Sequence, residues 1–432
     1  MARPSYRVEL VTVLFFSITL AVVDNAFVSV YVKQTFAGIA PDVLLNFVVA
    51  LVGSASEIAN ILSFFWVSMS HGVRKVPFIN GLQIAVVALV AALAVVPHSV
   101  GGLLVFASLI MLARVAWSGI ILLRPTVWRA NYRKDRASVV GRFSSIQQFL
   151  VATVGMVLGF WLDRVPDLFE TAAPAAAVLG LVGVLATRKL RIRRERALLA
   201  DEQHPDRRRR VGRPWQGPAI VWRVLRQDRR FAQFMICMFV LGFGNIMVGP
   251  MLVIALRDQF GFGYFGSLLV TSAVPYFLMP LAVPLWARFL DRAHVVQFRS
   301  IHSWSFCGSA LFFLLAVVLD APALLFAGSI LLAIGYGGGT IAWNLGHVDF
   351  SPPAETSQYM ATHVTLNGVR GLLAPLLSVA LYERLRAWDL PVSTSAAIVL
   401  LIAFVLSCAG GVGFILLQRS MAKAGPFKRR AA

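Results

Sequence analysis

Charged residues are scarce in this chain, and their scarcity excludes an ordinary soluble protein. Only 14% of the 432 residues are Asp, Glu, Lys or Arg, whereas soluble domains carry about 25%. Cysteine is rarer still: Cys237, Cys307 and Cys408 are too far apart for a zinc motif or a disulfide framework, so we interpret them as packing residues. The sequence also shows no nucleotide-binding motif and no stretch that fits a soluble ATPase domain.

Long apolar runs are what the chain has in abundance. Hydrophobic residues make up 58% of it, and its mean hydropathy is +0.75. A helix needs about 20 mostly apolar residues to cross a bilayer core about 30 Å thick, and runs of that length recur from Val8 to Gln418. We therefore predict an all-α polytopic membrane protein with about twelve transmembrane helices. The predicted spans are 8–32, 42–66, 77–97, 101–123, 143–164, 172–188, 230–255, 265–288, 299–319, 323–346, 359–383 and 394–418.

Basic residues are concentrated in the middle of the chain, between Arg188 and Arg230. They divide the predicted spans six and six. This division predicts an N-terminal half over 1–190, a basic cytoplasmic linker over 191–229 and a C-terminal half over 230–432. With the linker in the cytoplasm, the positive-inside rule places both termini there as well.

The same linker indicates a lipid partner. The net charge of +20 would suggest nucleic acid in a soluble protein, but here the run Arg207–Arg210 is expected to attract anionic membrane lipid. Apolar residues at helical spacing from Trp215 to Arg226, flanked by arginines, predict an amphipathic helix on the inner leaflet. We therefore expect membrane lipids as partners, and no nucleic acid.

Two short loops, after the second and eighth predicted helices, carry a related pattern of charges. The later one reads Ala287-Arg288-Phe289-Leu290-Asp291-Arg292, and the earlier one Ser70-His71-Gly72-Val73-Arg74-Lys75. Asp291 with Arg292, and Arg74 with Lys75, resemble parts of the G-x-x-x-D-R-x-G-R-[RK] signature loop of the major facilitator superfamily. Ser70 stands where the family has Asp. The resemblance implies a major facilitator fold of two six-helix halves, with loops that lock helices together on the cytoplasmic side, and it identifies no subfamily.

Ionisable residues inside predicted spans point to a cavity, because intramembrane charges turn toward the bundle interior or a water-filled space. The third, sixth and twelfth helices carry none in their central stretches, and the ninth has only His302 near its start. The family resemblance makes these four the lipid-facing helices. The predicted coupling and substrate cavity comprises Asp24, Asn25, Glu57, Arg114, Asn245, Asn344, His363, Asn367 and Arg370.

Two of these residues have two interpretations each. Asp24 is either the carboxylate that gains and loses a coupling proton or an interfacial residue that caps nearby polar groups. Arg114 resembles an arginine that many proton-coupled members of the family carry, and it either holds a substrate anion or only pairs with Asp24.

Two further pairs of residues each have two interpretations. Glu57 and Arg370 either form a salt bridge between the halves in one access state or each pair within their own half. Met247 and Met251 lie one turn apart and could bind Cu(I), but packing is the better interpretation, so we expect no metal and no cofactor.

The sequence thus predicts a secondary active transporter rather than an enzyme. The predicted transporter moves a small solute by alternating access and is coupled to protons. The two intramembrane arginines favour an organic or inorganic anion. A composition rich in Arg and Ala suggests a bacterial plasma (inner) membrane, and we expect a monomer. Two alternatives stay open: a non-transporting receptor or assembly factor with the same fold, and a membrane-embedded enzyme that uses His347, Asp349 and His363.

Overall fold

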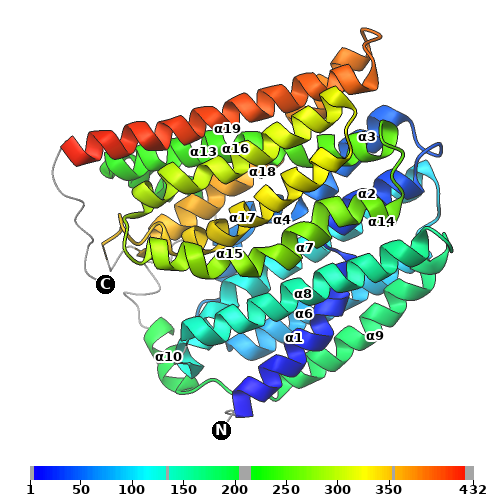
Figure 1. Cartoon of the computed structure of the whole chain (residues 1–432). Helices are drawn as coiled ribbons and strands as arrows, with labels where there is room; N and C mark the ends of the chain where they lie inside the picture. Colours follow the sequence, from blue (N-terminus) through cyan, green and yellow to red (C-terminus); the bar gives the residue numbers. More distant parts are fainter. Residues whose placement is uncertain (1–3, 133–135, 204–215, 353–355, 424–432) are drawn as a thin grey trace.

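The computed structural model describes residues 4–132, 136–203, 216–352 and 356–423, and every regular element within them is a helix (Figure 1). The N-terminal half contains α1 (Pro4–Val22), α2 (Asn25–Thr35), α3 (Asp42–Gly53), α4 (Ala55–Ala59), η1 (Asn60–Leu62), α5 (Ser63–Ser70), α6 (Lys75–Ala92), η2 (Leu93–Val95), α7 (Val100–Asn131), α8 (Arg136–Leu162) and α9 (Leu168–Arg188). Between the halves lie α10 (Glu195–Gln203) and α12 (Gly217–Gln227). The C-terminal half contains α13 (Arg229–Asp258), α14 (Tyr264–Leu268), the π-helical η4 (Leu269–Ala273), α15 (Val274–Leu290), α16 (Val295–Leu319), α17 (Ala323–Leu345), α18 (Thr356–Arg386) and α19 (Val392–Lys423).

The described residues contain 11 helices long and apolar enough to cross a membrane, and one bent pair raises the total to 12. The predicted all-α polytopic fold is therefore confirmed. Some boundaries are wrong, because charged residues within a helix were assigned to loops. The fourth predicted span, 101–123, is part of α7, which continues past Arg124 to Asn131.

Two predicted spans are broken rather than continuous. The first breaks at Asp24, whose backbone is extended and whose carboxylate accepts a hydrogen bond of 3.1 Å from the amide N–H of Ala26, capping α2. The second breaks at Ser54, and the two parts of that span are bent by 57°. Each break leaves backbone groups that need other partners inside a membrane. At the first break, the Asp24 carboxylate is such a partner for the amide N–H of Ala26.

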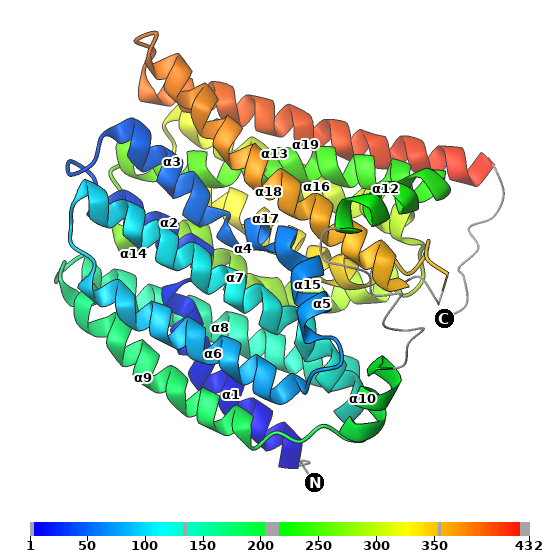
Figure 2. The ribbon, with the colours of Figure 1, turned by 180° about the vertical axis from the view of Figure 1, so that it is seen from behind.

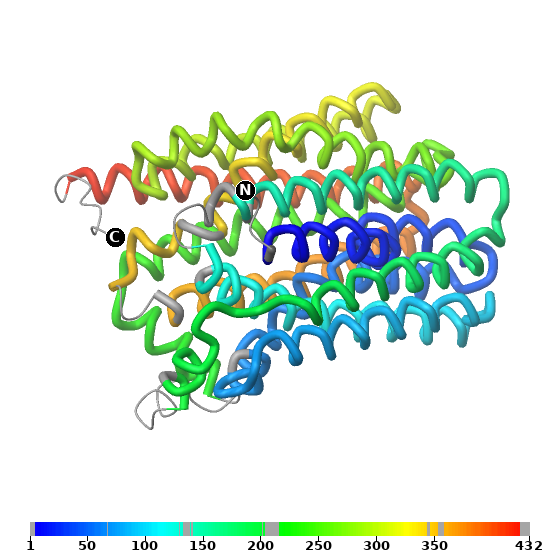
Figure 3. Tube along the Cα trace, turned by 90° about the horizontal axis from the view of Figure 1, so that it is seen from below, coloured from blue at the N-terminus to red at the C-terminus, as the bar shows by residue number. Residues whose placement is uncertain are grey.

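The two halves form separate bundles that pack side by side (Figure 1). Most of the buried apolar residues form one cluster in each half. The halves meet where α3 and α4 pack on α18, and where α8 packs on α14 and α15. We call the end of the bundle that carries the start of α1 and the end of α19 the terminal side, and the opposite end the far side (Figures 2 and 3).

The linker lies on the terminal side, as the ribbon from behind shows (Figure 2). Helix α12 falls within the segment predicted to be amphipathic, and it packs against α13 and α18 with Val224 buried and Trp222 exposed. The ring of Phe64 in α5 lies against Gly217, where a Cβ would come within 2.8 Å of it. The run Arg207–Arg210, which we expect to attract anionic lipid, lies outside the described residues.

Candidate functional site

Two neighbouring cavities lie on the boundary between the halves. The larger, which we call the central cavity, has a volume of about 500 Å³ and is lined by α4, α7, α13, α17 and α18, among other helices. A second cavity of about 240 Å³ lies next to it and is lined by α2, α3, α13 and α15. The two share Glu57, Asn245, Ile246 and Tyr336 as lining residues.

Asp24 and Arg114 meet beside the central cavity. The break that ends α1 directs the Asp24 carboxylate toward α7, where one of its oxygens lies 3.6 Å from a terminal guanidinium nitrogen of Arg114. Both side chains are largely buried, with exposures of 15% and 7%. In this conformation Asp24 therefore both caps α2 and pairs with Arg114, and Arg114 lines the cavity.

Glu57 lies at the start of α4, just after the bend at Ser54. Its carboxylate accepts a hydrogen bond of 3.1 Å from the amide nitrogen of Asn25, and the Asn25 oxygen accepts one of 3.1 Å from the hydroxyl of Ser56. Close approach of α18 positions this turn, because a Cβ added at Gly371 would collide with Glu57.

Arg370 lines the same cavity but forms no ion pair with Glu57 in this conformation. Its Nε and Nη2 donate to Asn367 Oδ1 at 3.0 and 2.6 Å, and its Nη1 donates to the carbonyl oxygen of Met238. Each of the two charges is thus hydrogen-bonded within its own half. A salt bridge between them in another access state stays a prediction.

The remaining predicted cavity residues are in the C-terminal half. Asn245 lines both cavities. His363 is buried, and its ring lies 4.3 Å, centroid to centroid, from that of Trp343, which lines the central cavity. Asn344 lies near the end of α17, and its side chain is outside the part of the structure that is described.

Arg299 is a cavity residue that sequence reasoning missed. It stands at the very start of the predicted ninth span, 299–319, and was counted with the charges of the preceding loop. In the structure it lies in the second turn of α16 with 3% of its surface exposed and lines the central cavity. His302, one turn later, is fully buried and contacts the carbonyl oxygen of Gly335 at 2.8 Å. The prediction that the ninth helix only faces lipid is wrong for this part of α16. The spacing of Arg299 and His302 by three residues was the signal for a shared inner face.

Met247 and Met251 lie in the apolar core of α13, with 3% and 0% exposure. This placement agrees with packing.

His347 and Asp349 lie in the turn that follows α17. The Asp349 carboxylate accepts a hydrogen bond of 2.7 Å from the amide N–H of Val295 at the start of α16. Burial lowers the pKa of His347 to about 4, so the ring is neutral at physiological pH. Among the described residues there is no group of three or more His, Cys, Asp or Glu that could hold a metal ion.

The signature-like loop after α5 obtains a carboxylate from the linker. The Lys75 ammonium is buried and lies 2.7 Å from Glu202 of α10, and the same carboxylate accepts a hydrogen bond of 2.8 Å from the Gly72 amide. Arg74 pairs with Glu195 of the same helix at 3.3 Å. An acidic residue therefore does reach this loop, although Ser70 stands in the expected position. Nothing in the local sequence indicated Glu202, which is 127 residues from Lys75.

The second signature-like loop begins at the terminal-side end of α15. Asp291 is the C-terminal cap of that helix, and its side chain and that of Arg292 are exposed.

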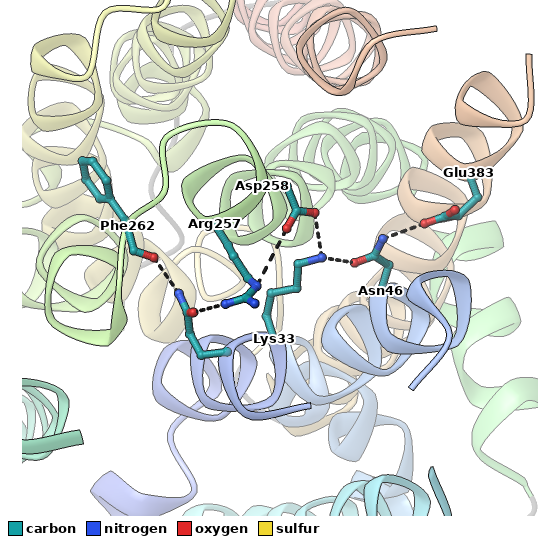
Figure 4. Close-up of polar contacts among 7 residues, drawn as sticks. Lys33, Asn46, Arg257, Asp258, Phe262 and Glu383 are labelled. Atoms are coloured by element: carbon teal, nitrogen blue, oxygen red, sulfur yellow. Dashed lines mark hydrogen bonds and ion pairs between the residues drawn. The ribbon is translucent and has the colours of Figure 1, made fainter. Parts of the chain in front are cut away.

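A polar network joins the two halves at the far side (Figure 4). Lys33, 3% exposed, lies 2.7 Å from Asp258 and donates a hydrogen bond of 2.9 Å to Asn46, whose amide nitrogen donates one of 2.7 Å to Glu383. Gln34 donates a hydrogen bond of 2.7 Å to the carbonyl oxygen of Phe262 and accepts one from Arg257. We call these seven residues the far-side seal. Lys33 and Arg257 lie just outside the predicted spans 8–32 and 230–255. Their partners, Asp258 and Gln34, could not be predicted because each contact joins helices more than 200 residues apart in sequence.

Comparison with known proteins adds to this geometry. The family model described as Major Facilitator Superfamily matches residues 11–375. No curated protein matches the chain in a comparison of sequences.

Solved structures similar to the chain include three transporters. A D323A mutant of the nucleoside transporter NupG has a TM-score of 0.72 at 13% identity, covering 96% of this chain and 100% of that one. The POT family transporter PepTSo has a TM-score of 0.71 at 13% identity, with 97% and 98% covered. A D-xylose-proton symporter has a TM-score of 0.70 at 13% identity, with 99% of each chain covered. At these identities the likeness shows the fold alone.

Proposed function

Because this chain belongs to the Major Facilitator Superfamily, we propose that it is a proton-coupled secondary transporter that moves a small anionic solute by alternating access. The observation that carries the proposal is the central cavity. It lies between two six-helix halves, is lined by Glu57, Arg114 and Arg370, and is closed off at one end of the bundle by the far-side seal. One of the similar structures is that of a D-xylose-proton symporter.

Asp24 is the group to which we assign the coupling proton. Its carboxylate is paired with Arg114 at 3.6 Å, so the positive charge of Arg114 is balanced only while Asp24 is ionised. Protonation would release Arg114, which lines the cavity and could then bind an anionic solute. Pairing with Asp24 and binding of a substrate anion, the two interpretations of Arg114, would then be two steps of one cycle. Glu57 is the second carboxylate within the boundary and lies on both cavities.

The orientation follows from the positive charge of the linker. We propose that the terminal side faces the cytoplasm and the far side faces outward, so that this conformation is closed to the outside. We further propose that the protein acts as a monomer in a bacterial plasma membrane, with anionic lipid at the basic linker. The N-terminal half, linker and C-terminal half are proposed as its working units, with bounds at 1–190, 191–229 and 230–432.

Proteoliposomes that contain a trapped pH-sensitive dye test the proposal. Small carboxylates, phosphate esters and their neutral analogues are added outside, and internal pH and uptake of labelled solute are both recorded. We expect acidification with at least one anion. We expect none in Asp24→Asn, which should still exchange labelled solute because the amide mimics the protonated carboxylate. Asp389→Asn, at an exposed far-side turn with positive φ, is the matched control.

The outcomes separate the parts of the proposal. Uptake of a solute without proton movement would contradict the proposed proton coupling. Uptake of no compound in the panel by wild-type protein would contradict transport of small anions.

A further inference from the structure

The two walls of the central cavity differ in how their buried charges are balanced. In the N-terminal half, Arg114 has Asp24. In the C-terminal half, Arg299 and Arg370 line the cavity with exposures of 3% and 9%. Among the described residues neither has a carboxylate within 4.0 Å, and the hydrogen-bond acceptors of Arg370 are a side-chain amide and a backbone carbonyl.

Arg299 is the less satisfied of the two. One of its terminal nitrogens lies 3.3 Å from Nδ1 of His302, and its Nε has no hydrogen-bond partner in the described structure. The guanidinium of Arg370 lines the same cavity and has the same charge. Burying a charge without a partner is costly. A negative group that binds beside Arg299 and Arg370 would therefore be stabilised.

The charges of the whole site confirm the imbalance. Three guanidiniums line the cavity, those of Arg114, Arg299 and Arg370, and the carboxylates of Glu57 and Asp24 oppose them. Three positive against two negative charges leave one positive charge in excess. Protonation of either carboxylate would raise the excess to two.

Other side chains suit an anion with an organic body. His363 lies seven residues before Arg370 and so on the same face of α18. It is 4% exposed, and neither of its ring nitrogens has a hydrogen-bond partner among the described residues. Trp343 and Tyr336 supply apolar surface in the cavity wall. Arginine matches carboxylate and phosphate oxygens with paired N–H donors.

We propose that Arg299 and Arg370 form an oxyanion subsite that binds the carboxylate or phosphate group of the transported solute. The subsite rests on the proposed function for its role in transport, but its binding chemistry is testable separately. It names a specific part of the cavity, the α16–α18 wall, as the place where the negative group sits. Arg114, in the N-terminal half, would join this subsite as a further guanidinium only when Asp24 is protonated.

Binding to purified protein in detergent tests the subsite without any transport step. The probes are small carboxylic acids, the amides of the same acids, and inorganic phosphate, and the measurement is thermal stabilisation titrated to an apparent Kd. Wild-type protein should prefer at least one acid to its amide. Arg299→Gln and Arg370→Gln should each weaken binding of the acid about 10- to 100-fold, the range for a lost charge-assisted hydrogen bond, and leave the amide unchanged.

Two sets of control variants separate a loss of anion binding from misfolding. Arg299→Lys and Arg370→Lys retain the charge and should recover part of the lost affinity, which a merely misfolded variant would not do. Arg223→Gln, on the exposed surface of α12, should bind like wild type.

Several results would overturn the subsite. These are equal binding of acids and amides by wild-type protein, an unchanged preference in both Gln variants, or no binding of any acid or of phosphate. If the acid preference is present and lost in the variants but proteoliposomes show no transport, the subsite stands and the proposed function fails.

Discussion

The two ends of the boundary between the halves are held in different ways. At the far side, hydrogen bonds and the Lys33–Asp258 ion pair run directly from one half to the other. At the terminal side, the polar bonds of α10 join the linker to the loop of Arg74 and Lys75 within the N-terminal half. A rotation of the halves must therefore break the far-side seal, whereas it can leave α10 in place. In the proposed alternating-access cycle, the far-side seal would open and close, and α10 would move together with the N-terminal half.

The largest effect is expected from Lys33→Met. Removing one partner of a buried ion pair is costly, and the 26% exposure of Asp258 reduces the cost to about 1.5–3 kcal/mol. The balance between access states should shift about 10- to 100-fold toward an open far side. Distances between spin labels across the far side would measure the shift. Arg384→Gln, an exposed charge at the same end of the bundle, is the control. An unchanged distance distribution in Lys33→Met would show that the pair does not hold this conformation.

Gly371→Ala should weaken the boundary at mid-depth, between the two ends. Its added Cβ would overlap Glu57 of α4, and overpacking costs about 1–3 kcal/mol. The conformation described here should lose population, again toward the far-side-open state. Gly81→Ala, on α6 with nothing within 4 Å of the added Cβ, should leave the label distances unchanged. Wild-type behaviour of Gly371→Ala would mean that α4 and α18 can separate freely.

Asn46→Leu should open the far side less than Lys33→Met does. The Asn46 amide links the Lys33 ammonium to the Glu383 carboxylate, but the ion pair with Asp258 remains without it. We expect a loss of about 1 kcal/mol, a shift of about fivefold. An effect as large as that of Lys33→Met would place the strength of the seal in the amide bridge instead of the ion pair.

Glu202→Gln should have the smallest effect on the access states and a local effect on the linker. The buried Lys75 ammonium would lose its charged partner, so hydrogen exchange of the α10 amides should become faster. The label distances at the far side should stay as in wild type. Glu195→Gln is the milder companion, because its partner Arg74 is 66% exposed. A change at the far side in Glu202→Gln would contradict the contrast between the two ends.

Sequence patterns could predict the membrane-spanning fold because apolar length alone defines a span. They could not predict the breaks at Asp24 and Ser54. Neither break is marked by proline, and a break inside a bundle is stabilised by contacts that hydropathy does not describe. The sequence also predicted Glu57, Arg114 and Arg370 as cavity residues, and all three line the central cavity.

The interaction partners of charged side chains were harder to predict than the helices on which those side chains lie. Arg299 was missed because the predicted start of its helix is uncertain by several residues. A shift of that size determines whether Arg299 lies in a loop or faces the cavity. The carboxylate of Glu202 was missed because it comes from a helix far along the chain. In both cases tertiary packing determines which charge meets which.

The short helix α2 links the centre of the molecule to its far side. Asp24 caps its first turn, and Lys33, Gln34 and Thr35 end it, with two of these in the far-side seal. Eleven residues at about 1.5 Å each make a rod of about 16 Å, and it contains neither glycine nor proline. Such a rod transmits a displacement from one end to the other. In the proposed cycle, a proton that binds Asp24 would therefore act at one end of α2, whose other end is bonded to the opposite half. The spin labels that report on the far-side seal should then also report on Asp24→Asn.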